Sequence, residues 1–363
     1  MTKKNIALRV DASAQMGLGH FMRCLTLADA LKERGVNTRF LSRNLPVYLQ
    51  ELLGSKGHEC AVFQSAADRV VGDDLTHAGW LESTQLQDVA DCAEALSGLT
   101  WDWLIVDHYA LDVRWEKPAR TLARKIMAID DIADRQHNAD VLLDQNLYLD
   151  MRQRYSGLLN VDCVQLLGPK YALLRTEFVR QRENLRPRDG TVKRVLIFFG
   201  GTDATNETGK ALEAIGFLKI PQLELDIVVG AANEHVSGLN VRCQSFGNAR
   251  MHRQVTNMAE LMDAADFCIG AAGTATWERC ALGLPALVVS VAENQIEIAQ
   301  GVDDFKAQRY LGTCADVSAA TLASELAMAI KEPFSLQEMS QKALALVDAL
   351  GAERLVSVLE AAS

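Results

Sequence analysis

The sequence predicts an α/β protein with two doubly wound parallel sheets, and three observations lead to that fold class. Short apolar runs of the β type alternate with amphipathic helical segments along most of the chain. Several runs are apolar at consecutive positions, which is typical of strands that helices cover on both faces. The alternation also restarts near the middle of the chain, after a polar segment, so two such sheets are expected.

Each half of the chain opens with a strand, a glycine-containing turn and a helix, as nucleotide-binding sheets do. The expected strands lie at 6–10, 39–41, 103–106 and 125–129 in the first half, and at 195–199, 225–229, 267–269 and 286–290 in the second. Helices are expected to close the molecule after residue 317, because apolar residues there recur at helical spacing: Leu322, Leu326, Ile330, Leu344, Val347 and Leu350.

The segment 182–190 is polar, contains Pro187 and Gly190, and comes just before the strand at 195–199. This composition is typical of a linker. We therefore expect an N-terminal domain at 1–185, a C-terminal domain at 193–345, and a last helix at 346–363 that packs back on the N-terminal domain. A length of 363 residues fits two domains, with a cleft between them.

The composition is that of an ordinary soluble globular protein, with 49% hydrophobic and 23% charged residues. The net charge of −10 offers no general attraction to nucleic acid or to a membrane surface, so neither is expected as a partner. No apolar run reaches the ~20 residues that span a bilayer, and a cytoplasmic location is expected. The sequence leaves the oligomeric state open, a monomer included.

Eight cysteines are spread along the chain without a CxxC pair, so neither disulfides nor a zinc site are expected. No HExxH or DxD motif occurs, and the carboxylate pairs Asp73-Asp74, Asp130-Asp131 and Asp303-Asp304 are interpreted as surface or turn residues. The sequence thus predicts a protein that works without metal or cofactor.

The first glycine turn, Gly17-Leu18-Gly19, comes before a helix that starts near His20. Glycines let the backbone approach a ligand closely, and N–H groups at a helix start favour an anion or a polar oxygen. Position alone leaves two roles open for His20, a capping or packing residue or a base. A helix N-terminus disfavours the imidazolium form, so a neutral ring that accepts a proton from water is the chemically useful alternative.

Two further turns follow strands in the second half, Gly200-Gly201-Thr202 and Gly273-Thr274, and Glu278 comes one helical turn after the latter. This combination suits a nucleoside diphosphate, because N–H groups and threonine hydroxyls can bind phosphate while a carboxylate accepts both ribose hydroxyls. The alternative for Glu278 is a solvated helix charge. Neither a P-loop nor the third glycine of a dinucleotide fingerprint is present, so ATP hydrolysis and nicotinamide chemistry lose support.

The chain resembles the UDP-sugar hydrolases of the pseudaminic acid pathway, which release 2,4-diacetamido-2,4,6-trideoxy-L-altrose from its UDP-linked form. The resemblance spans nearly the whole chain. It is carried by RVDAS at 9–13, GLGHFMRCLTLA at 17–28, VDHY at 106–109, DDIADR at 130–135, LDQN at 143–146, GPKYALLR at 168–175, the segment 270–278 and AENQ at 292–295. More distantly, the second half is similar to the nucleotide-binding half of the peptidoglycan N-acetylglucosaminyltransferase.

Both resemblances imply a GT-B architecture that binds UDP in the cleft between two Rossmann-like domains, with the chemistry supplied by the N-terminal one. They imply that Glu278 holds the ribose and that the neighbourhood of Val255 holds the uracil. The diphosphate contacts fall on Gly201, Thr202, Gly273 and Thr274. Further substrate-binding positions taken from the matching motifs are Asp11, Gly17, Gly19, Arg23 and Gln295.

For the hydrolase family, the implied catalytic base is His20, with Tyr109 and Asn294 around the sugar and the water. His108 is a competing base that the motif does not exclude, while Asp107 ends a strand and can orient another group. The expected reaction is a direct displacement by water at the anomeric carbon, which inverts the configuration. A GT-B glycosyltransferase using a UDP-sugar donor and a non-catalytic nucleotide-sugar-binding protein are the alternatives.

Overall fold

The computed structural model describes residues 3–13, 15–64 and 73–361. The chain divides into two compact units, each with a parallel sheet. Unit 1 contains residues 1–146, 150–173 and 350–363, and unit 2 contains residues 147–149 and 174–349. The expected α/β class is confirmed. The expected domain limits at 185 and 346 stay a prediction. The two units change at 173/174 and at 349/350, several residues from those limits.

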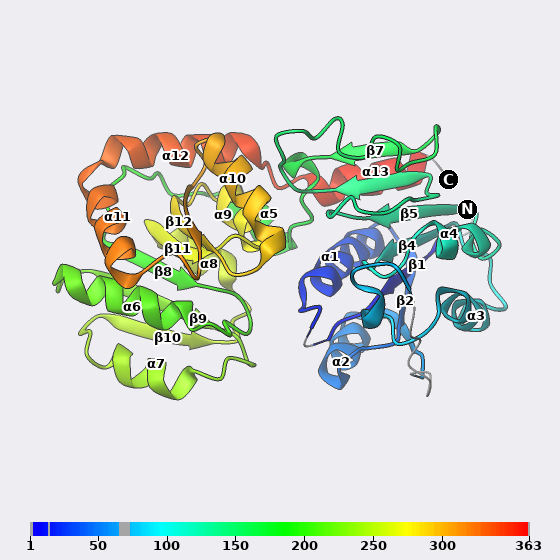
Figure 1. The fold of residues 1–363 in the computed structure, drawn as a ribbon, viewed down its shortest axis with the longest axis horizontal. Coiled ribbons are helices and arrows are strands. Elements are labelled where there is room, and N and C mark those ends of the chain that lie inside the picture. Colours follow the sequence, from blue (N-terminus) through cyan, green and yellow to red (C-terminus); the bar gives the residue numbers. More distant parts are fainter. Residues whose placement is uncertain (1–2, 14, 65–72, 362–363) are drawn as a thin grey trace. The chain divides into compact units, whose positions relative to one another are not determined.

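The sheet of unit 1 has the order β3-β2-β1-β4-β5-β6-β7 among the described residues, and every pairing is parallel. Its inner strand β1 pairs with β2 on one side and with β4 on the other (Figure 1). Its strands are β1 (Asn5–Val10), β2 (Asn37–Ser42), β3 (Glu59–Val62), β4 (Trp103–Asp107), β5 (Lys125–Ile129), β6 (Val141–Asp144) and β7 (Val164–Leu167).

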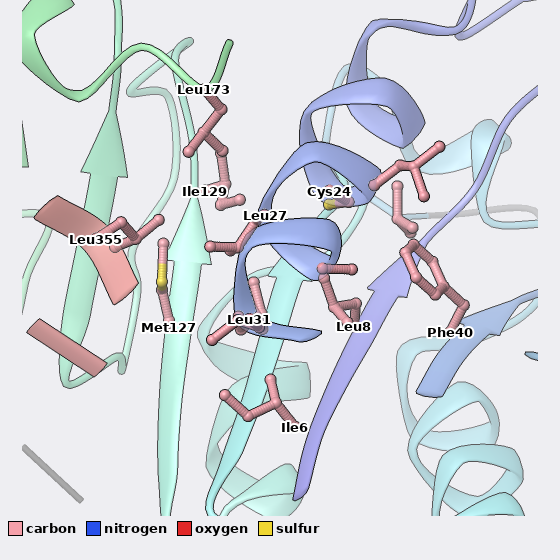
Figure 2. Close-up of a cluster of buried hydrophobic side chains, with 14 of the residues drawn as sticks. Ile6, Leu8, Cys24, Leu27, Leu31, Phe40, Met127, Ile129, Leu173 and Leu355 are labelled. Carbon is pink, nitrogen blue, oxygen red and sulfur yellow. The ribbon is translucent and has the colours of Figure 1, made fainter. Parts of the chain in front are cut away.

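Helices cover both faces of this sheet. Side chains of α1, α2 and α13 share one buried cluster with Ile6 and Leu8 of β1, and side chains of α3 and α4 share the opposite cluster with Ala7. Figure 2 shows Leu27 and Leu31 of α1 and Leu355 of α13 in the first cluster. The helices are α1 (Gly19–Glu33), α2 (Val47–Lys56), α3 (Gln85–Ala95), α4 (Val113–Ala119) and α13 (Gly351–Ala361), with 3-10 turns at Ala78–Trp80 and Pro169–Tyr171.

The sheet of unit 2 has the order β10-β9-β8-β11-β12-β13 among the described residues and is also parallel. Its strands are β8 (Arg194–Phe198), β9 (Glu224–Val229), β10 (Ala249–Arg253), β11 (Phe267–Ala271), β12 (Ala286–Ser290) and β13 (Arg309–Thr313). Its helices are α5 (Thr176–Arg182), α6 (Glu207–Leu218), α7 (Val236–Cys243), α8 (Met258–Ala264), α9 (Ala275–Ala281), α10 (Ile296–Asp304), α11 (Ala319–Lys331) and α12 (Pro333–Leu346), with a 3-10 turn at Glu293–Gln295.

The C-terminal helices differ in one place from the sequence pattern. Leu322 and Leu326 are buried on α11, as their helical spacing predicts. However, α12 ends at Leu346, and both Val347 and Leu350 lie in the connection to α13. Val347 is buried but Leu350 is exposed, so the apolar spacing there does not mark one face of a continuous helix.

In both sheets the chain order reverses at the central strand, between β1 and β4 in unit 1 and between β8 and β11 in unit 2. Ligands of open parallel sheets bind at the carboxyl ends of the strands flanking such a point. The loops after these strands carry most of the residues singled out from the sequence. None of the helices in the described part of the chain combines the length and the apolar character needed to cross a bilayer.

Candidate functional site

Several of the predicted residues of unit 1 meet at the carboxyl ends of its central strands. His20 is the second residue of α1, which follows the loop after β1. Asp107 is the last residue of β4, and Tyr109 comes two residues later. Asp131 follows β5, the next strand in the sheet. Because parallel strands end at the same edge of the sheet, these side chains lie in one group.

His20 and Asp107 form a buried hydrogen-bonded pair. Nδ1 of His20 lies 2.6 Å from Oδ1 of Asp107, and the histidine is 7% exposed while the aspartate is fully buried. Burial raises the pKa of Asp107, but Arg23 and His20 outweigh burial and hold that pKa below its ordinary range. The carboxylate is therefore ionised and accepts the Nδ1 proton. The hydrogen bonds of the His20 ring to described residues are made by Nδ1, and Nε2 bonds to none of them.

Arg23 and Tyr109 complete this group. Arg23 donates from Nε and Nη2 to both oxygens of Asp107, at 2.6 and 2.7 Å, and from Nη1 to Asp131 at 2.8 Å. The Tyr109 ring stands edge-on to the His20 ring, with centroids 4.6 Å apart, and its hydroxyl donates to Asp131. Burial raises the pKa of Tyr109 well above its ordinary value, so the phenol is neutral.

His108, the competing base, lies in a different environment. It is fully buried, its Nδ1 accepts the N–H of Ala110 at 3.1 Å, and its Nε2 faces Oδ2 of Asp11 at 3.2 Å. Burial lowers the pKa of His108, so the ring is neutral. Both ring nitrogens thus face protein groups, and neither reaches the surface.

Asp11 was expected to bind substrate, but its carboxylate is occupied by the protein itself. It is fully buried and accepts Oγ of Ser42 at 2.9 Å and the backbone N–H of Arg43 at 2.6 Å. The guanidinium of Arg9 lies 2.8 Å away. Asp11 therefore holds the loop after β2 against β1, and a contact with substrate would require this network to open.

Gly17 and Gly19 form the approach to α1. Gly17 has a φ of 72°, in the region that favours glycine, and its N–H donates to the carbonyl of Ser13 at 2.9 Å. Leu18 precedes the helix and provides no side-chain cap, so the first N–H groups from Gly19 onward are not capped by a side chain. His20 lies immediately beside these N–H groups.

The turn after β8 in unit 2 leaves Gly201 and Thr202 exposed. Gly200 has a φ of 92°, and a Cβ added at Gly230 would lie 2.1 Å from the carbonyl oxygen of Gly201, so this turn packs backbone to backbone on the loop after β9. The start of α6 differs from expectation. Its N–H groups at 207 and 208 bond the carboxylate of Asp203, at 2.8 and 3.0 Å, and are not available to a phosphate.

The turn after β11 places Glu278 on α9, one turn after Thr274, which has no side-chain capping bond. The Glu278 side chain is 17% exposed, and its Oε1 accepts a hydrogen bond of 3.0 Å from Nη2 of Arg175. Burial raises the pKa of Glu278, and Arg175 opposes that rise. Glu278 is thus not a solvated helix charge, because it is mostly buried and held by a specific partner. Nη1 of Arg175 also forms an ion pair with Glu177 at 2.6 Å.

Gln295 lies beside Gly273. A Cβ added at Gly273 would be 3.5 Å from Nε2 of Gln295, whose Oε1 accepts the N–H of Val291 at 3.0 Å. Asn294 is the preceding residue and is exposed. Val255 lies partly buried in the loop after β10, the edge strand of this sheet. The structure thus brings together His20, Arg23 and Tyr109 in unit 1, and Gly273 and Gln295 in unit 2. Thr274 and Glu278 lie on the turn and the helix that follow Gly273.

Sequence reasoning missed Asp131 and Arg175 as partners of the predicted residues. Asp130 is fully buried and pairs with Arg135 at 2.8 Å, so it is not a surface residue. Its carboxylate accepts the N–H of Ala133 at 2.9 Å, which agrees with the alternative interpretation as a turn residue. The interpretation as a surface residue is correct for Asp74, whose side chain is 85% exposed. The available signal was position, because Asp130 and Asp131 directly follow a strand and therefore lie at the edge where ligands bind.

Metal ligands are not grouped in the described residues 3–13, 15–64 and 73–361, where no three His, Cys, Asp or Glu side chains are arranged to hold an ion. Metal independence stays a prediction.

Comparison with known proteins identifies the fold. MurG from Acinetobacter baumannii superposes on 99% of this chain and 99% of its own with a TM-score of 0.66, at 16% sequence identity. The protein has a GT-B fold. The expected architecture of two Rossmann-like parallel α/β units is therefore confirmed. A model of the Glycosyltransferase family 28 C-terminal domain matches residues 195–355, which cover most of unit 2 and less than half of the chain.

Three relatives are similar in sequence. The spore coat polysaccharide biosynthesis protein SpsG of Bacillus subtilis is 23% identical over 98% of both chains. The UDP-2,4-diacetamido-2,4,6-trideoxy-beta-L-altropyranose hydrolase of Campylobacter jejuni is 23% identical over 80% of this chain and 93% of its own. An uncharacterized protein of Methanocaldococcus jannaschii is 25% identical over 80% of this chain, and the match spans 57% of that relative's length.

Proposed function

We propose that this protein hydrolyses a UDP-linked 2,4-diacetamido-2,4,6-trideoxyhexose, an L-altrose derivative, at the anomeric C–O bond. The products are UDP and the free sugar for nonulosonic (pseudaminic) acid synthesis. The observation that carries the proposal is the His20–Asp107 pair, which leaves Nε2 of His20 unbonded at the ligand-binding edge of the sheet. The similarity to the Campylobacter jejuni hydrolase and the GT-B fold support the choice of a UDP-sugar as substrate.

The proposed reaction is a single displacement. Nε2 of His20 takes a proton from a water molecule as the water attacks the anomeric carbon, and the electron pair of the C–O bond leaves with UDP. One displacement inverts the configuration. Asp107 keeps the ring oriented and stabilises the imidazolium that forms, as a buried carboxylate does for a catalytic histidine. Tyr109 stands against the His20 ring, where its hydroxyl can contact the sugar or the water.

Unit 2 supplies the proposed nucleotide contacts. Glu278 accepts the ribose hydroxyls, the turns at Gly201-Thr202 and Gly273-Thr274 bind the diphosphate, and Val255 contacts the uracil. The N–H groups of these turns stabilise the negative charge that grows on the leaving UDP, so the reaction needs no metal. Asn294 and Gln295 follow β12, beside the turn that carries Gly273, and we assign them to the sugar and the water.

A glycosyltransferase is the second candidate, and the match to the family 28 C-terminal domain favours it. Such an enzyme would bind the same UDP-sugar but pass the sugar to an acceptor. A non-catalytic nucleotide-sugar-binding protein would use the same nucleotide residues without turnover.

The experiment that separates these functions is incubation with the UDP-diacetamido sugar in oxygen-18 water, without any acceptor. We expect UDP release, with the heavy oxygen on the anomeric carbon of the free sugar, as read by mass spectrometry. NMR spectra recorded at the first turnovers are expected to show the inverted anomer. Heavy oxygen on UDP would contradict anomeric cleavage, and turnover that begins only when an acceptor is added would identify a transferase.

A further inference from the structure

Arg23 lies at the centre of a buried group of side chains that connects His20 to Tyr109. On one side it binds both oxygens of Asp107, which holds Nδ1 of His20. On the other side it binds Asp131, which accepts the hydroxyl of Tyr109. We propose that Arg23 and Asp131 are positioning residues that fix the Tyr109 hydroxyl relative to the His20 ring. The inference rests on the proposed function, in which these two side chains act on sugar and water.

The contacts of Arg23 leave it little capacity to bind substrate, the role expected from the sequence. It is 6% exposed, and Nε, Nη1 and Nη2 each donate to a carboxylate at 2.6 to 2.8 Å. Burial works against the charge of Arg23, but Asp107 and Asp131 outweigh burial and raise its pKa above the ordinary value. A planar guanidinium can bind two carboxylates in fixed directions, which the point charge of a lysine cannot do.

Tyr109 is held at both ends of its side chain. Its ring lies edge-on to His20 at an interplanar angle of 84° and stacks on Trp80 with centroids 5.7 Å apart. Its hydroxyl donates to Asp131, which also accepts Nδ2 of Asn146 at 3.2 Å. The aromatic contacts fix the ring, and Asp131 fixes the direction of the O–H bond. Arg23 in turn holds Asp131 in place.

Arg23 is a counter-charge of the fully buried Asp107, which in turn holds Nδ1 of His20. Removing the guanidinium would take a positive charge away from this buried carboxylate, which is destabilising. Asp131→Asn keeps the shape of the side chain and is the better test.

The test is a double-mutant cycle on UDP-sugar hydrolysis with Asp131→Asn, Tyr109→Phe and the double variant. If Asp131 acts through Tyr109, each single variant lowers kcat by about 30-fold and the double variant loses no more than the larger single loss. KM is expected to stay within about threefold, because the nucleotide contacts belong to unit 2. Independent losses would multiply to about 1000-fold and would overturn the inference.

The matched control is Asp88→Asn. Asp88 is also fully buried in unit 1 and is bound in the same two-point manner by Arg9, at 2.9 and 2.8 Å. We expect this variant to lose thermal stability. In the double variant with Tyr109→Phe, the fold-losses in kcat per folded molecule that each substitution causes alone are expected to multiply.

A second readout does not depend on turnover. In protein labelled with 13C at tyrosine Cζ, the Tyr109 signal, identified by its absence in Tyr109→Phe, is expected to shift in both Asp131→Asn and Arg23→Lys, but not in Asp88→Asn. An unshifted signal in the first two variants would overturn the inference. If the wild-type protein does not hydrolyse the UDP-sugar, the proposed function fails, and this signal alone decides whether Arg23 and Asp131 position Tyr109.

Discussion

The carboxylate of Glu278 accepts a hydrogen bond of 3.0 Å from Nη2 of Arg175, the residue immediately before α5. The pair joins the helix after the turn at Gly273 to the start of unit 2. Burial makes the charged form of Glu278 unfavourable, and Arg175 offsets part of that cost. Only the ionised carboxylate offers two charge-assisted acceptor oxygens to the proposed pair of ribose hydroxyls.

Arg175→Gln is expected to make UDP binding more sensitive to acid. Without the guanidinium, the raised pKa of Glu278 rises further, so the carboxylate is protonated at a higher pH than in the wild type. UDP affinity, measured by calorimetry between pH 5 and 8, should fall as the pH is lowered, and the midpoint of that fall should lie at higher pH in the variant. The matched control is Arg180→Gln, an exposed arginine on α5. Coincident curves for Arg175→Gln and the wild type would contradict the assignment.

Glu278→Ala is expected to weaken UDP binding by about 1 to 3 kcal/mol, because the charge-assisted hydrogen bonds that we propose to the ribose are lost. Calorimetric titration with UDP measures the change. Glu213→Ala, which removes an exposed carboxylate from α6 in the same unit, should bind UDP like the wild type. Equal affinities of the Glu278 variant and the wild type would exclude a ribose contact.

Under the proposed function, His20→Asn is expected to abolish hydrolysis while leaving the affinity for UDP within several-fold, because the imidazole of the proposed base acts mainly in the transition state. His108→Asn provides the contrast. Its ring is fully buried between Ala110 and Asp11, so we expect a lower melting temperature and a kcat within about tenfold of the wild type. The reverse pattern, with His20→Asn active and His108→Asn folded but inactive, would move the base to His108.

The stability of unit 1 is expected to fall as the pH rises towards 9, because of His137. Burial lowers the pKa of His137, but Asp130 and Glu116 outweigh burial and raise the pKa from its ordinary value of 6.5 to about 9. The charged ring therefore adds stability in full below pH 6.5, and that contribution is lost as the pH passes about 9. Thermal unfolding of the full chain at several pH values should show this decline.

His137→Gln should be less stable than the wild type at pH 6, and the difference should shrink as the pH approaches 9. His235→Gln is the control, since the described contact of that partly exposed imidazole is a 3.3 Å approach to the carbonyl of Ala204. A constant difference between the His137 variant and the wild type from pH 6 to 9 would show that the charge of His137 contributes no stability.

The inner strands were predictable because burial on both faces requires apolar residues at consecutive positions. Leu196, Ile197 and Cys268 are fully buried examples. The edge strands β3, β7, β10 and β13 were missed, because their outer sides are partly exposed and their residues are mixed in polarity. The buried strand β6 was also missed, although residues 141–143 are apolar at consecutive positions.

The candidate site, like the strands, could be predicted only in part from the sequence. Glycine turns after strands indicate where a ligand can bind, since only a few residue types adopt those backbone angles. The helix start favoured His20 over His108 as the base, but the local pattern did not exclude His108, because both follow or begin elements at the same edge of the sheet. The difference lies in which ring nitrogen is left free, and that depends on Asp107 and Asp11, which are distant from their partners in sequence.

The amino-acid order alone determined the parallel α/β character, the repeated strand–turn–helix openings and the positions of the turns, because these follow from hydrophobic periodicity and backbone preference over a few residues. The folded chain decided which charged side chains pair. Arg23 became the partner of Asp107 and Asp131, and Glu278 the partner of Arg175, because electrostatic interactions depend on distance in space and on burial, and separation along the chain predicts neither.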